Sequence, residues 1–293
     1  MEDCILKINL LVFIALTVFY LYQMIYIVVV LFQKRKEKDR TPAALHRFGV
    51  VIAARNESMV IGNLLRSIKN QTYPAELIDI FVVADNCTDN TAEIAQQEGA
   101  VVYQRVNRQQ VGKGYALDFA FHHIAQGYGS SYHDAFFVFD ADNLLDPHYI
   151  EEMNRVFCQG YPVITSYRNS KNYGTNWITA GYSLWFLREA KYLNNARMIL
   201  GTNCAISGTG FLISSEIVRK YDGWKFHLLT EDIEFSIASA IEGDRIGYCE
   251  KAILYDEQPE TFRQSWTQRL RWSKGFYQVV WNYGGKLLSK LFK

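Results

Sequence analysis

The sequence predicts an α/β fold with a mainly parallel central sheet covered by helices on both faces. One N-terminal transmembrane helix is expected before this domain, and a C-terminal amphipathic interfacial helix after it. Two observations predict this fold. Apolar, strand-like runs alternate with helical runs from Phe48 onward, which is the pattern of βαβ units. An almost unbroken apolar stretch lies near the N-terminus. With 293 residues and 49% apolar content, the chain can bury the core of one large domain.

The first expected element is the apolar stretch from Leu10 to Phe32. At about 1.5 Å per residue it covers the roughly 30 Å hydrocarbon core of a membrane. Basic residues dominate the segment that follows, so the positive-inside rule places the rest of the chain in the cytoplasm. We therefore expect a single-pass protein of the cell membrane, with an anchor at residues 1–33 and a basic linker at 34–47. A cleaved signal peptide is the alternative, but the stretch is too long and no small-x-small cleavage site follows it.

The alternating elements occupy residues 48–258, which we expect to form one α/β domain. The expected strands are 48–53, 78–84, 101–103, 135–139 and 211–213, with one or two more in 245–255; the expected helices are 57–70, 91–97, 114–126, 176–200 and 231–241. In such sheets ligands bind beyond the carboxyl ends of the strands. Asp85 and Asp140 each follow a strand, so we expect both to line one crevice.

The last expected element is a helix at 262–283, within a C-terminal segment at 259–293 that ends in a basic tail. Gln268, Arg271 and Trp272 fall at i, i+3 and i+4 and therefore share one face. The opposite face is apolar: Phe262, Trp266, Leu270, Tyr277 and Trp281. This apolar face would pack on the core or lie in the lipid headgroup zone. An ordinary cationic surface helix is the alternative.

Composition excludes two classes of protein. The net charge of +1 gives no global field that would attract nucleic acid. The five cysteines are dispersed and show no C-x-x-C spacing, which argues against a disulfide framework or a zinc site and for reduced thiols in the cytoplasm. The aromatic content of 15% suits either a sugar-binding cleft or a membrane interface.

The pair Asp140 and Asp142 is the strongest candidate for a metal site. If strand geometry persists through the pair, both side chains point the same way. Two carboxylates at the carboxyl end of a strand suit Mg²⁺ or Mn²⁺ carrying phosphate oxygens. The alternative is a loop in which these residues cap a helix.

Three further residues are candidates for binding or catalysis. Asp85 lies in a strand-to-helix turn, where its carboxylate would accept hydrogen bonds from a nucleobase or ribose, or would only stabilise the turn. Lys113 stands between two glycines and can approach a phosphate closely. Asp232 follows Thr230 and Glu231 at a helix start; it is either a general base for an acceptor hydroxyl or a complement to the helix dipole.

Taken together, these motifs resemble the family 2 inverting glycosyltransferases with a GT-A catalytic domain. The resemblance is to the branch that contains cellulose, chitin, hyaluronan and poly-N-acetylglucosamine synthases. The matching stretches occur in family order from about Phe48 to Trp272: Ala54-Arg55-Asn56-Glu57, the Asp85 turn, Gly112-Lys113-Gly114, Asp140-Ala141-Asp142, Ser207-Gly208-Thr209-Gly210, Thr230-Glu231-Asp232 and Gln268-Arg269-Leu270-Arg271-Trp272.

The resemblance implies a Rossmann-like GT-A fold and a role for each matching residue. Arg55, Glu57, Asp85, Lys113 and Asp140 would bind the nucleotide, usually of a UDP-sugar. Asp142, with Asp140 beside it, would hold Mg²⁺ or Mn²⁺. Asp232 would be the catalytic base that gives a β-linkage from an α-linked donor. Glu231, Gln268, Arg271 and Trp272 would border the diphosphate and the acceptor.

The expected partners are a nucleotide-sugar donor, a glycan or lipid-linked acceptor, and the membrane. Synthases of this branch usually carry several further transmembrane helices, and one helix cannot form a polymer channel. We therefore expect a piece of a longer protein, an oligomer or complex with a membrane subunit, or an enzyme that adds few sugars. A non-catalytic nucleotide-sugar-binding subunit is the alternative function, but it predicts loss of Asp142 or Asp232, and both are present. A sugar nucleotidyltransferase predicts a Gly-rich loop after the first strand, and residues 53–57 do not form one.

Overall fold

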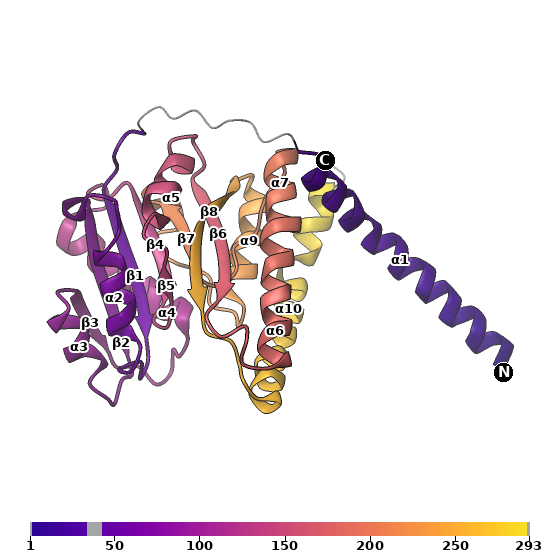
Figure 1. The fold of residues 1–293 in the computed structure, drawn as a ribbon, viewed down its shortest axis with the longest axis horizontal. Helices are drawn as coiled ribbons and strands as arrows, with labels where there is room; N and C mark the ends of the chain where they lie inside the picture. The colour runs from indigo at the N-terminus through magenta and orange to yellow at the C-terminus, as the bar shows by residue number, and fades with distance from the viewer. Residues whose placement is uncertain (1, 34–42, 292–293) are drawn as a thin grey trace.

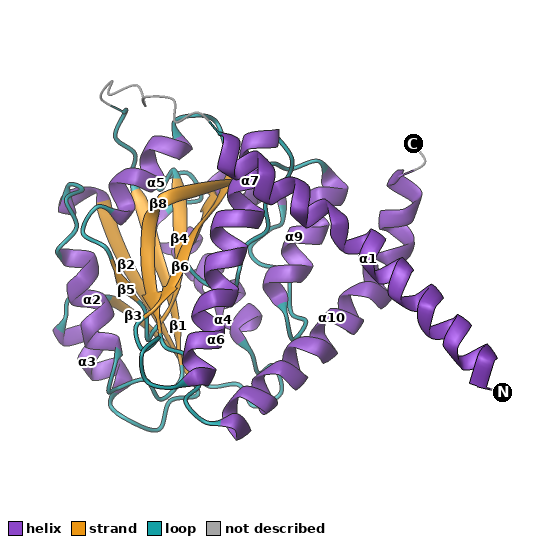
Figure 2. Ribbon diagram, turned by 45° about the vertical axis from the view of Figure 1, so that its right-hand side comes forward, coloured by secondary structure: helices purple, strands orange, loops and turns teal. Residues whose placement is uncertain are grey.

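A computed structural model of the chain describes residues 2–33 and 43–291. Within these residues, eight strands form one sheet in the order β3-β2-β1-β4-β7-β6-β8-β5. Figure 1 shows α6, α7 and α10 beside the sheet, and α1 projecting from the body of the domain. Figure 2 shows the strands between layers of helices. The α/β fold expected from the sequence is confirmed.

The strands are β1 (Phe48–Ala54), β2 (Ile78–Asp85), β3 (Val101–Arg105), β4 (Ala135–Asp140), β5 (Leu144–Leu145), β6 (Val163–Ser170), β7 (Phe211–Ser214) and β8 (Ile246–Asp256). The helices are α1 (Glu2–Phe32), α2 (Ile61–Lys69), η1 (Ala75–Leu77), α3 (Thr91–Gln97), α4 (Lys113–Tyr128), α5 (Tyr149–Phe157), α6 (Trp177–Leu187), η2 (Arg188–Asn194), α7 (Asn195–Leu200), α8 (Ser215–Lys220), α9 (Glu231–Glu242) and α10 (Phe262–Leu291).

The sheet is mixed, and four of the seven strand pairings among the described residues are parallel, in line with the mainly parallel sheet that the sequence predicted. Strands β3, β2, β1 and β4 are parallel to one another, and so are β6 and β8. Strand β7 runs antiparallel to both of its neighbours, and β5 antiparallel to β8. The reversal of β7 follows from its entry turn at 207–210, which stands at the edge where β4 ends: the Gly210 amide donates to the Val138 carbonyl at 2.9 Å.

Both faces of the sheet are buried because alternate strand residues point to opposite sides. On one face, Val50 and Ile52 pack in a core with the apolar sides of α2 and α5. On the other, Val51 packs in a second core with α4 and with Phe235 of α9. The two cores fix the helices that lead into and out of the carboxyl edge of the sheet.

Five elements were not expected from the sequence: η1, β5, α5, β6 and α8. Helix α5 has its apolar residues at helical spacing, so a signal was present. Strand β6 ends in Arg168-Asn169-Ser170, so its apolar run is too short to predict an eight-residue strand. The helix expected from Glu57 begins later, at Ile61, because the amides of Glu57 and Ser58 bind the side chains of Thr91 and Asp89.

Helix α1 contacts the domain only through its last turns. These turns lie against η2 and α7, where the Arg188 guanidinium donates to Gln23 Oε1 at 2.6 Å. Residues 34–42, most of the expected basic linker, lie outside the described residues. Helix α10 continues past the expected end at residue 283, to Leu291.

Helix α4 can approach the loop before α9 only because its second residue is glycine. A Cβ on Gly114 would lie 2.1 Å from the Phe226 carbonyl oxygen, whereas a Cβ on Gly127 of the same helix meets nothing within 4 Å. Gly114→Ala should therefore lower the free energy of unfolding by about 1–3 kcal/mol, as overpacking does. Gly127→Ala should raise it by about 0.5–1 kcal/mol, since alanine favours a helix. Chemical unfolding followed by circular dichroism measures both, and equal changes in the two variants would contradict the close approach.

Candidate active site

The register of three parallel strands brings the first acidic residues to one edge. Ala53 of β1 lies opposite Asp140 of β4, and Ala54 lies opposite Ala84 of β2. Asp85 and Asp140 therefore end the two strands that flank β1, about 12 Å apart at the usual strand spacing and rise, because Asp85 lies two residues farther along. The turns after β1 and β2 also interlock, because Asn56 Oδ1 accepts the Thr88 amide at 2.8 Å.

Lys113 joins this edge to the start of α9. Its ammonium donates to Asp140 Oδ1 and to the Gly208 carbonyl, the latter at 2.8 Å. Burial lowers the pKa of Lys113, but the carboxylates of Asp140, Glu231 and Asp232 outweigh burial and leave that pKa raised. The charged ammonium therefore offsets carboxylates from β4 and α9 at the same time.

Asp142 carries negative charge that the chain offsets only in part. Burial, followed by repulsion from Asp256 and Asp140, raises its pKa to about 7. Strand β4 ends at Asp140, so Asp142 lies in the turn that follows. The expectation that both side chains point the same way required strand geometry through the pair, and the structure does not have it. A buried, poorly neutralised carboxylate beside a second one suits a hard divalent cation.

The remaining ligands of such a cation would come from outside the chain. The described residues contain no cluster of three or more His, Cys, Asp or Glu side chains arranged to hold a metal ion. Mg²⁺ is commonly bound by one or two carboxylates together with substrate phosphates and water. The carboxylates of Asp142 and Asp140 fit this donor set.

Glu231 and Asp232 open helix α9. The Ile233 amide donates to Asp232 Oδ1 at 2.8 Å, which favours the charged form. Burial outweighs this hydrogen bond and raises the pKa of Asp232. Burial and then the neighbouring Asp232 carboxylate raise the pKa of Glu231 to about 7. Burial thus counters the acidifying effect of the helix N-terminus, which makes Asp232 a better proton acceptor.

The turn at 207–210 connects the two carboxylate groups. Gly208 has φ +70°, and a Cβ there would lie 3.6 Å from Asp232 Oδ2 and 3.8 Å from Arg168 Nη1. The hydroxyl of Thr209, the next residue, accepts the Asp140 amide at 2.8 Å. A single turn therefore lies beside the candidate base and binds the backbone of Asp140.

The residues expected to bind the nucleotide differ in exposure. Arg55 is exposed and Glu57 is half-buried. Burial, followed by the charges of Asp140 and Asp89, raises the pKa of Glu57. Arg55 and Glu57 follow β1 directly, so both stand beside the carboxyl ends of β2 and β4.

Asp85 is already paired within the protein. Its Oδ1 accepts Arg105 Nη1 at 2.6 Å, and both side chains are buried. The sequence analysis did not identify Arg105, although it lies directly opposite Asp85 in the register of β2 and β3. A nucleobase at this position would meet an ion pair and not a lone carboxylate.

Two of the three residues expected to act on helix α10 are half-buried. Trp272 is half-buried, and its ring packs edge-on against Tyr182 of α6 with centroids 6.0 Å apart. Gln268 is half-buried, and its Oε1 is buried without a hydrogen-bond partner among the described residues. Arg271 is exposed. A Cβ on Gly275 would lie 2.6 Å from the Thr230 side chain, so α10 rests directly on the segment that leads to Asp232.

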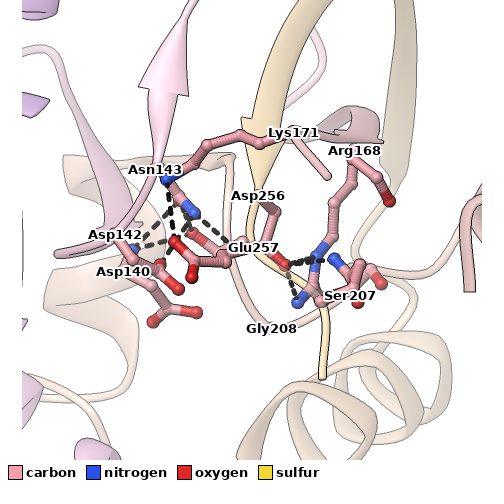
Figure 3. A network of polar contacts seen from close by, with 12 residues as sticks. Asp140, Asp142, Asn143, Arg168, Lys171, Ser207, Gly208, Asp256 and Glu257 are labelled. Atoms are coloured by element: carbon pink, nitrogen blue, oxygen red, sulfur yellow. Dashed lines mark hydrogen bonds and ion pairs between the residues drawn. The ribbon is translucent and has the colours of Figure 1, made fainter. Parts of the chain in front are cut away.

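A polar network next to Asp142 escaped the sequence analysis entirely (Figure 3). It contains Asn143, Arg168 and Asp256, of which Asn143 and Asp256 are buried and Arg168 is largely so. No motif marks these residues, because Arg168 lies on a strand that the sequence did not predict and is 88 residues from Asp256.

The chain resembles known proteins over most of its length. The family model described as Glycosyltransferase like family 2 matches residues 46–275. The chain is 28% identical to YdaM, a probable glycosyltransferase of Bacillus subtilis, over 85% of this chain and 59% of that protein. It is 25% identical to the beta-monoglucosyldiacylglycerol synthase of Synechocystis, over 80% of this chain and 48% of that protein. The chain thus spans between 48% and 59% of the length of these relatives.

Solved structures agree on the fold. The mannosyltransferase PcManGT of Pyrobaculum calidifontis, in complex with GDP-Man and Mn²⁺, aligns with a TM-score of 0.64 at 16% identity, covering 94% of this chain and 79% of that one. Residues 1–349 of Staphylococcus aureus TarS, in complex with UDP-GlcNAc, align with a TM-score of 0.53 at 17% identity, covering 75% of this chain and 60% of that one. These likenesses support the GT-A fold that the motifs implied.

The raised pKa values of Asp142 and Glu231 predict how pH and metal act on stability. Both groups hold protons in the folded chain at a pH where the unfolded chain has lost them, so the metal-free protein should lose stability as pH rises from about 4 to 7. A divalent cation replaces those protons, so Mn²⁺ should raise the melting temperature more at about pH 8 than at about pH 5.5. Thermal unfolding with and without Mn²⁺ at both pH values measures this difference.

The control for that experiment is Asp79→Asn. Asp79 is bound by Arg47 and His133 near the start of β2, away from the carboxyl edge. This variant should keep the Mn²⁺ effect and its pH dependence, whereas Asp142→Asn should lose most of the effect. An equal Mn²⁺ shift at both pH values in the unsubstituted chain would contradict the assignment.

Proposed function

We propose, because this chain belongs to the family described as Glycosyltransferase like family 2, that it transfers a sugar from a nucleotide sugar to a hydroxyl of a glycan or glycolipid with inversion at the anomeric carbon. The observation that carries the proposal is the position of Lys113, which bonds Asp140 and the Gly208 carbonyl, while Asp232 Oδ2 lies beside the same Gly208. Groups suited to a diphosphate and a group suited to deprotonate an acceptor therefore surround one ammonium. Inverting transfer needs both within one reaction centre.

Asp232 is the proposed catalytic base. It takes the proton of the acceptor hydroxyl while the hydroxyl oxygen forms a bond to the anomeric carbon from the face opposite the diphosphate. The bond between that carbon and the diphosphate oxygen breaks, and an α-linked donor yields a β-linked product. Burial, which raises the pKa of Asp232, favours this proton transfer.

The departing nucleoside diphosphate acquires charge that the site must stabilise. Asp142, with Asp140 beside it, would hold Mg²⁺ or Mn²⁺, which would neutralise part of that charge when bound. Lys113 supplies a fixed positive charge from the chain itself, and Arg271 of α10 is the second cation proposed for this role.

The proposed donor is a UDP-sugar. Arg55, Glu57 and the Asp85–Arg105 pair would line the nucleotide side, and the planar guanidinium of Arg105 adds donors for a base or ribose. TarS with UDP-GlcNAc supports this class of donor, while PcManGT with GDP-Man makes GDP-mannose the first alternative to assay.

The acceptor sugar would lie against α10. Gln268 has a buried oxygen without a protein partner, which a substrate hydroxyl would satisfy. Trp272 would stack on a sugar ring, with Tyr182 behind it. Glu231 would border the same space.

We also propose that residues 1–33 anchor the chain in the cell membrane, with the catalytic domain at 48–258 on the cytoplasmic side. Residues Asp3–Phe32 form a helix long and apolar enough to cross a membrane. Its side chains are exposed from residue 3 to Tyr22, and Gln23 is the first residue along the helix that hydrogen-bonds the domain among the described residues. Those twenty residues span about 30 Å, which matches the hydrocarbon core.

The C-terminal segment, 259–293, would rest on the membrane surface. Its helix α10 exposes an apolar stripe: Phe262, Trp266, Leu270, Tyr277 and Trp281. Between Phe262 and Leu291 the sequence carries basic residues and no acidic ones, which suits anionic lipid headgroups. Trp177 and Trp185 are also exposed on α6, against which α10 packs. Tryptophan favours the boundary between lipid and water.

Asp232→Asn tests the catalytic base. The variant should bind UDP or GDP with Mn²⁺ as tightly as the unsubstituted chain, because the donor groups are unchanged. Its transfer rate should fall by roughly 10²–10⁴-fold, the usual contribution of a general base. Release of UDP or GDP from a panel of nucleotide sugars, with mass analysis of the product, measures transfer, and Asp79→Asn serves as the folded control. Turnover near that of the unsubstituted chain would remove Asp232 from the mechanism.

Removal of residues 1–32 tests the two proposed membrane contacts. The truncated chain should partition less into the membrane fraction but stay partly bound through α10. Adding Trp266→Gln and Trp281→Gln should release most of what remains, since each buried tryptophan contributes roughly 1–3 kcal/mol. Sedimentation of membranes after expression measures the partition. Tyr132→Gln, another exposed aromatic residue, is the control in the truncated chain and should change nothing. Full solubility after truncation alone would contradict the role of α10.

A further inference from the structure

A buried ion pair lies next to Asp142 and has no part in the chemistry proposed above. Asp256 is the last residue of β8 and is 2% exposed. Its Oδ2 accepts Arg168 Nε at 2.8 Å, a second and shorter bond from Arg168 Nη2, and Gln258 Nε2 at 2.8 Å. The two charges therefore sit in a largely water-free region behind the carboxyl edge of the sheet (Figure 3).

Asn143 connects this ion pair to Asp142. Its Nδ2 donates to Asp256 Oδ1 at 2.8 Å and to Asp142 Oδ1 at 3.2 Å. Its Oδ1 accepts the Asp140 amide at 3.2 Å and the Thr209 hydroxyl at 2.5 Å. Because both ends of the carboxamide are engaged, its orientation is fixed, and one of its N–H groups must point at Asp142.

The contacts close into a ring around the candidate site. Arg168 Nη1 donates to the Ser207 carbonyl at 3.2 Å, and the next carbonyl, of Gly208, accepts Lys113. Lys113 in turn bonds Asp140, whose amide is held by Asn143. The ring ties the ends of β4, β6 and β8 to the turn at 207–210 and to the start of α4.

The segment that carries Asp142 depends on this ring for its shape. Residues 141–143 leave β4 and enter β5, whose Leu144 pairs with Tyr255 of β8. Among the described residues, Asn143 is the one side chain that donates a hydrogen bond to Asp142. A carboxylate in a turn with a single fixed donor takes its orientation from that donor.

An ion pair this deeply buried needs an explanation beyond stability. Removing two charges from water costs several kcal/mol. Apolar residues of similar size in the place of a buried ion pair often leave a protein equally stable or more stable. Polar groups that hydrogen-bond a metal ligand commonly fix the orientation of that ligand. Such a role would explain a buried polar network beside a candidate metal ligand.

We propose that Asn143, held in place by the Asp256–Arg168 pair, is a positioning residue that orients the Asp142 carboxylate toward the divalent cation that accompanies the donor diphosphate. The inference rests on the proposed function for the presence of that cation. It assigns to Asn143, Asp256 and Arg168 a role in metal affinity, whereas a purely structural role would affect only folding.

Asn143→Ala and Asn154→Ala form a matched pair of variants for the test. Asn154 on α5 is also a buried asparagine, 2% exposed against 1% for Asn143. Its Nδ2 donates to the Ala44 carbonyl at 2.8 Å, and its Oδ1 lies 2.8 Å from His46 Nδ1. Both substitutions remove a buried bridging amide, but only Asn143 contacts Asp142.

The experiment measures Mn²⁺ binding directly, by electron paramagnetic resonance of free Mn²⁺ in the presence of UDP or of GDP, on the full chain in detergent. Asn143→Ala should weaken Mn²⁺ binding by roughly 10–100-fold, the usual effect of losing a group that orients a metal ligand. The Mn²⁺ concentration for half-maximal nucleotide release should rise by the same factor, with kcat at saturating Mn²⁺ within about threefold. Asn154→Ala should lower the melting temperature and leave both Mn²⁺ constants unchanged.

A second variant keeps the test decisive if Asn143→Ala does not fold. Arg168→Met with Asp256→Leu replaces the ion pair by apolar side chains and leaves no unpaired charge, a change that proteins commonly tolerate. It should also weaken Mn²⁺ binding, because Asn143 loses the group that fixes its amide. Unchanged Mn²⁺ binding in either folded variant, or equal losses in Asn143→Ala and Asn154→Ala, would overturn the proposal.

Other results would contradict the proposed function and not the role of Asn143. An unsubstituted chain that transfers sugar equally well in chelator would remove the metal from the reaction and the premise with it. An unsubstituted chain that binds Mn²⁺ with UDP or GDP but releases no nucleotide from any donor would contradict the proposed function, while the Mn²⁺ titrations of the variants would still decide the role of Asn143.

Discussion

Repulsion among buried and half-buried carboxylates at one edge of the sheet is the constraint on which the rest of this site depends. Asp140, Asp142, Glu231, Asp232 and Asp256 come from β4, the turn after it, α9 and β8, and burial raises the pKa of three of them. Two cations offset this charge: Lys113 bonds Asp140 and the Gly208 carbonyl, and Arg168 neutralises Asp256. A divalent cation would neutralise the negative charge that remains near Asp142. The chain is thus built with a charge imbalance at the point where a metal-bound diphosphate is proposed to sit.

The fold creates that imbalance through close backbone approaches. Glycines at 114 and 275 let α4 and α10 rest on the segments before α9, and Gly208 lets a turn pass between Asp232 and Arg168. The reversal of β7 places this turn at the carboxyl edge instead of the opposite one. A Cβ at 114 or 275 would lie 2.1 Å or 2.6 Å from its nearest neighbour, so a side chain there would block the packing, whereas at Gly208 the φ of +70° favours glycine.

The proposed membrane surface and the proposed acceptor site share helices α6 and α10. Tyr182 and Trp272 meet where the two helices pack, while the outer sides of the same helices expose tryptophan at 177, 185, 266 and 281. Helix α1 joins this side of the domain through Arg188, at the junction of α6 and η2.

The sequence by itself determined the alternation of strands and helices, the apolar N-terminal helix, and the acidic residues that end β2 and β4, because periodicity and strand ends are local properties. Motif order also identified the family. The tertiary structure decided what those residues contact: Asp85 is paired with Arg105, and Lys113 joins Asp140 to the turn at Gly208. Arg271 is exposed while Trp272 is half-buried, and Asn143 links Asp142 to Asp256. It also decided the direction of β7 and the existence of β6, whose polar end gives no strand signal. These features depend on contacts between residues 20 to more than 100 positions apart, which no local pattern encodes.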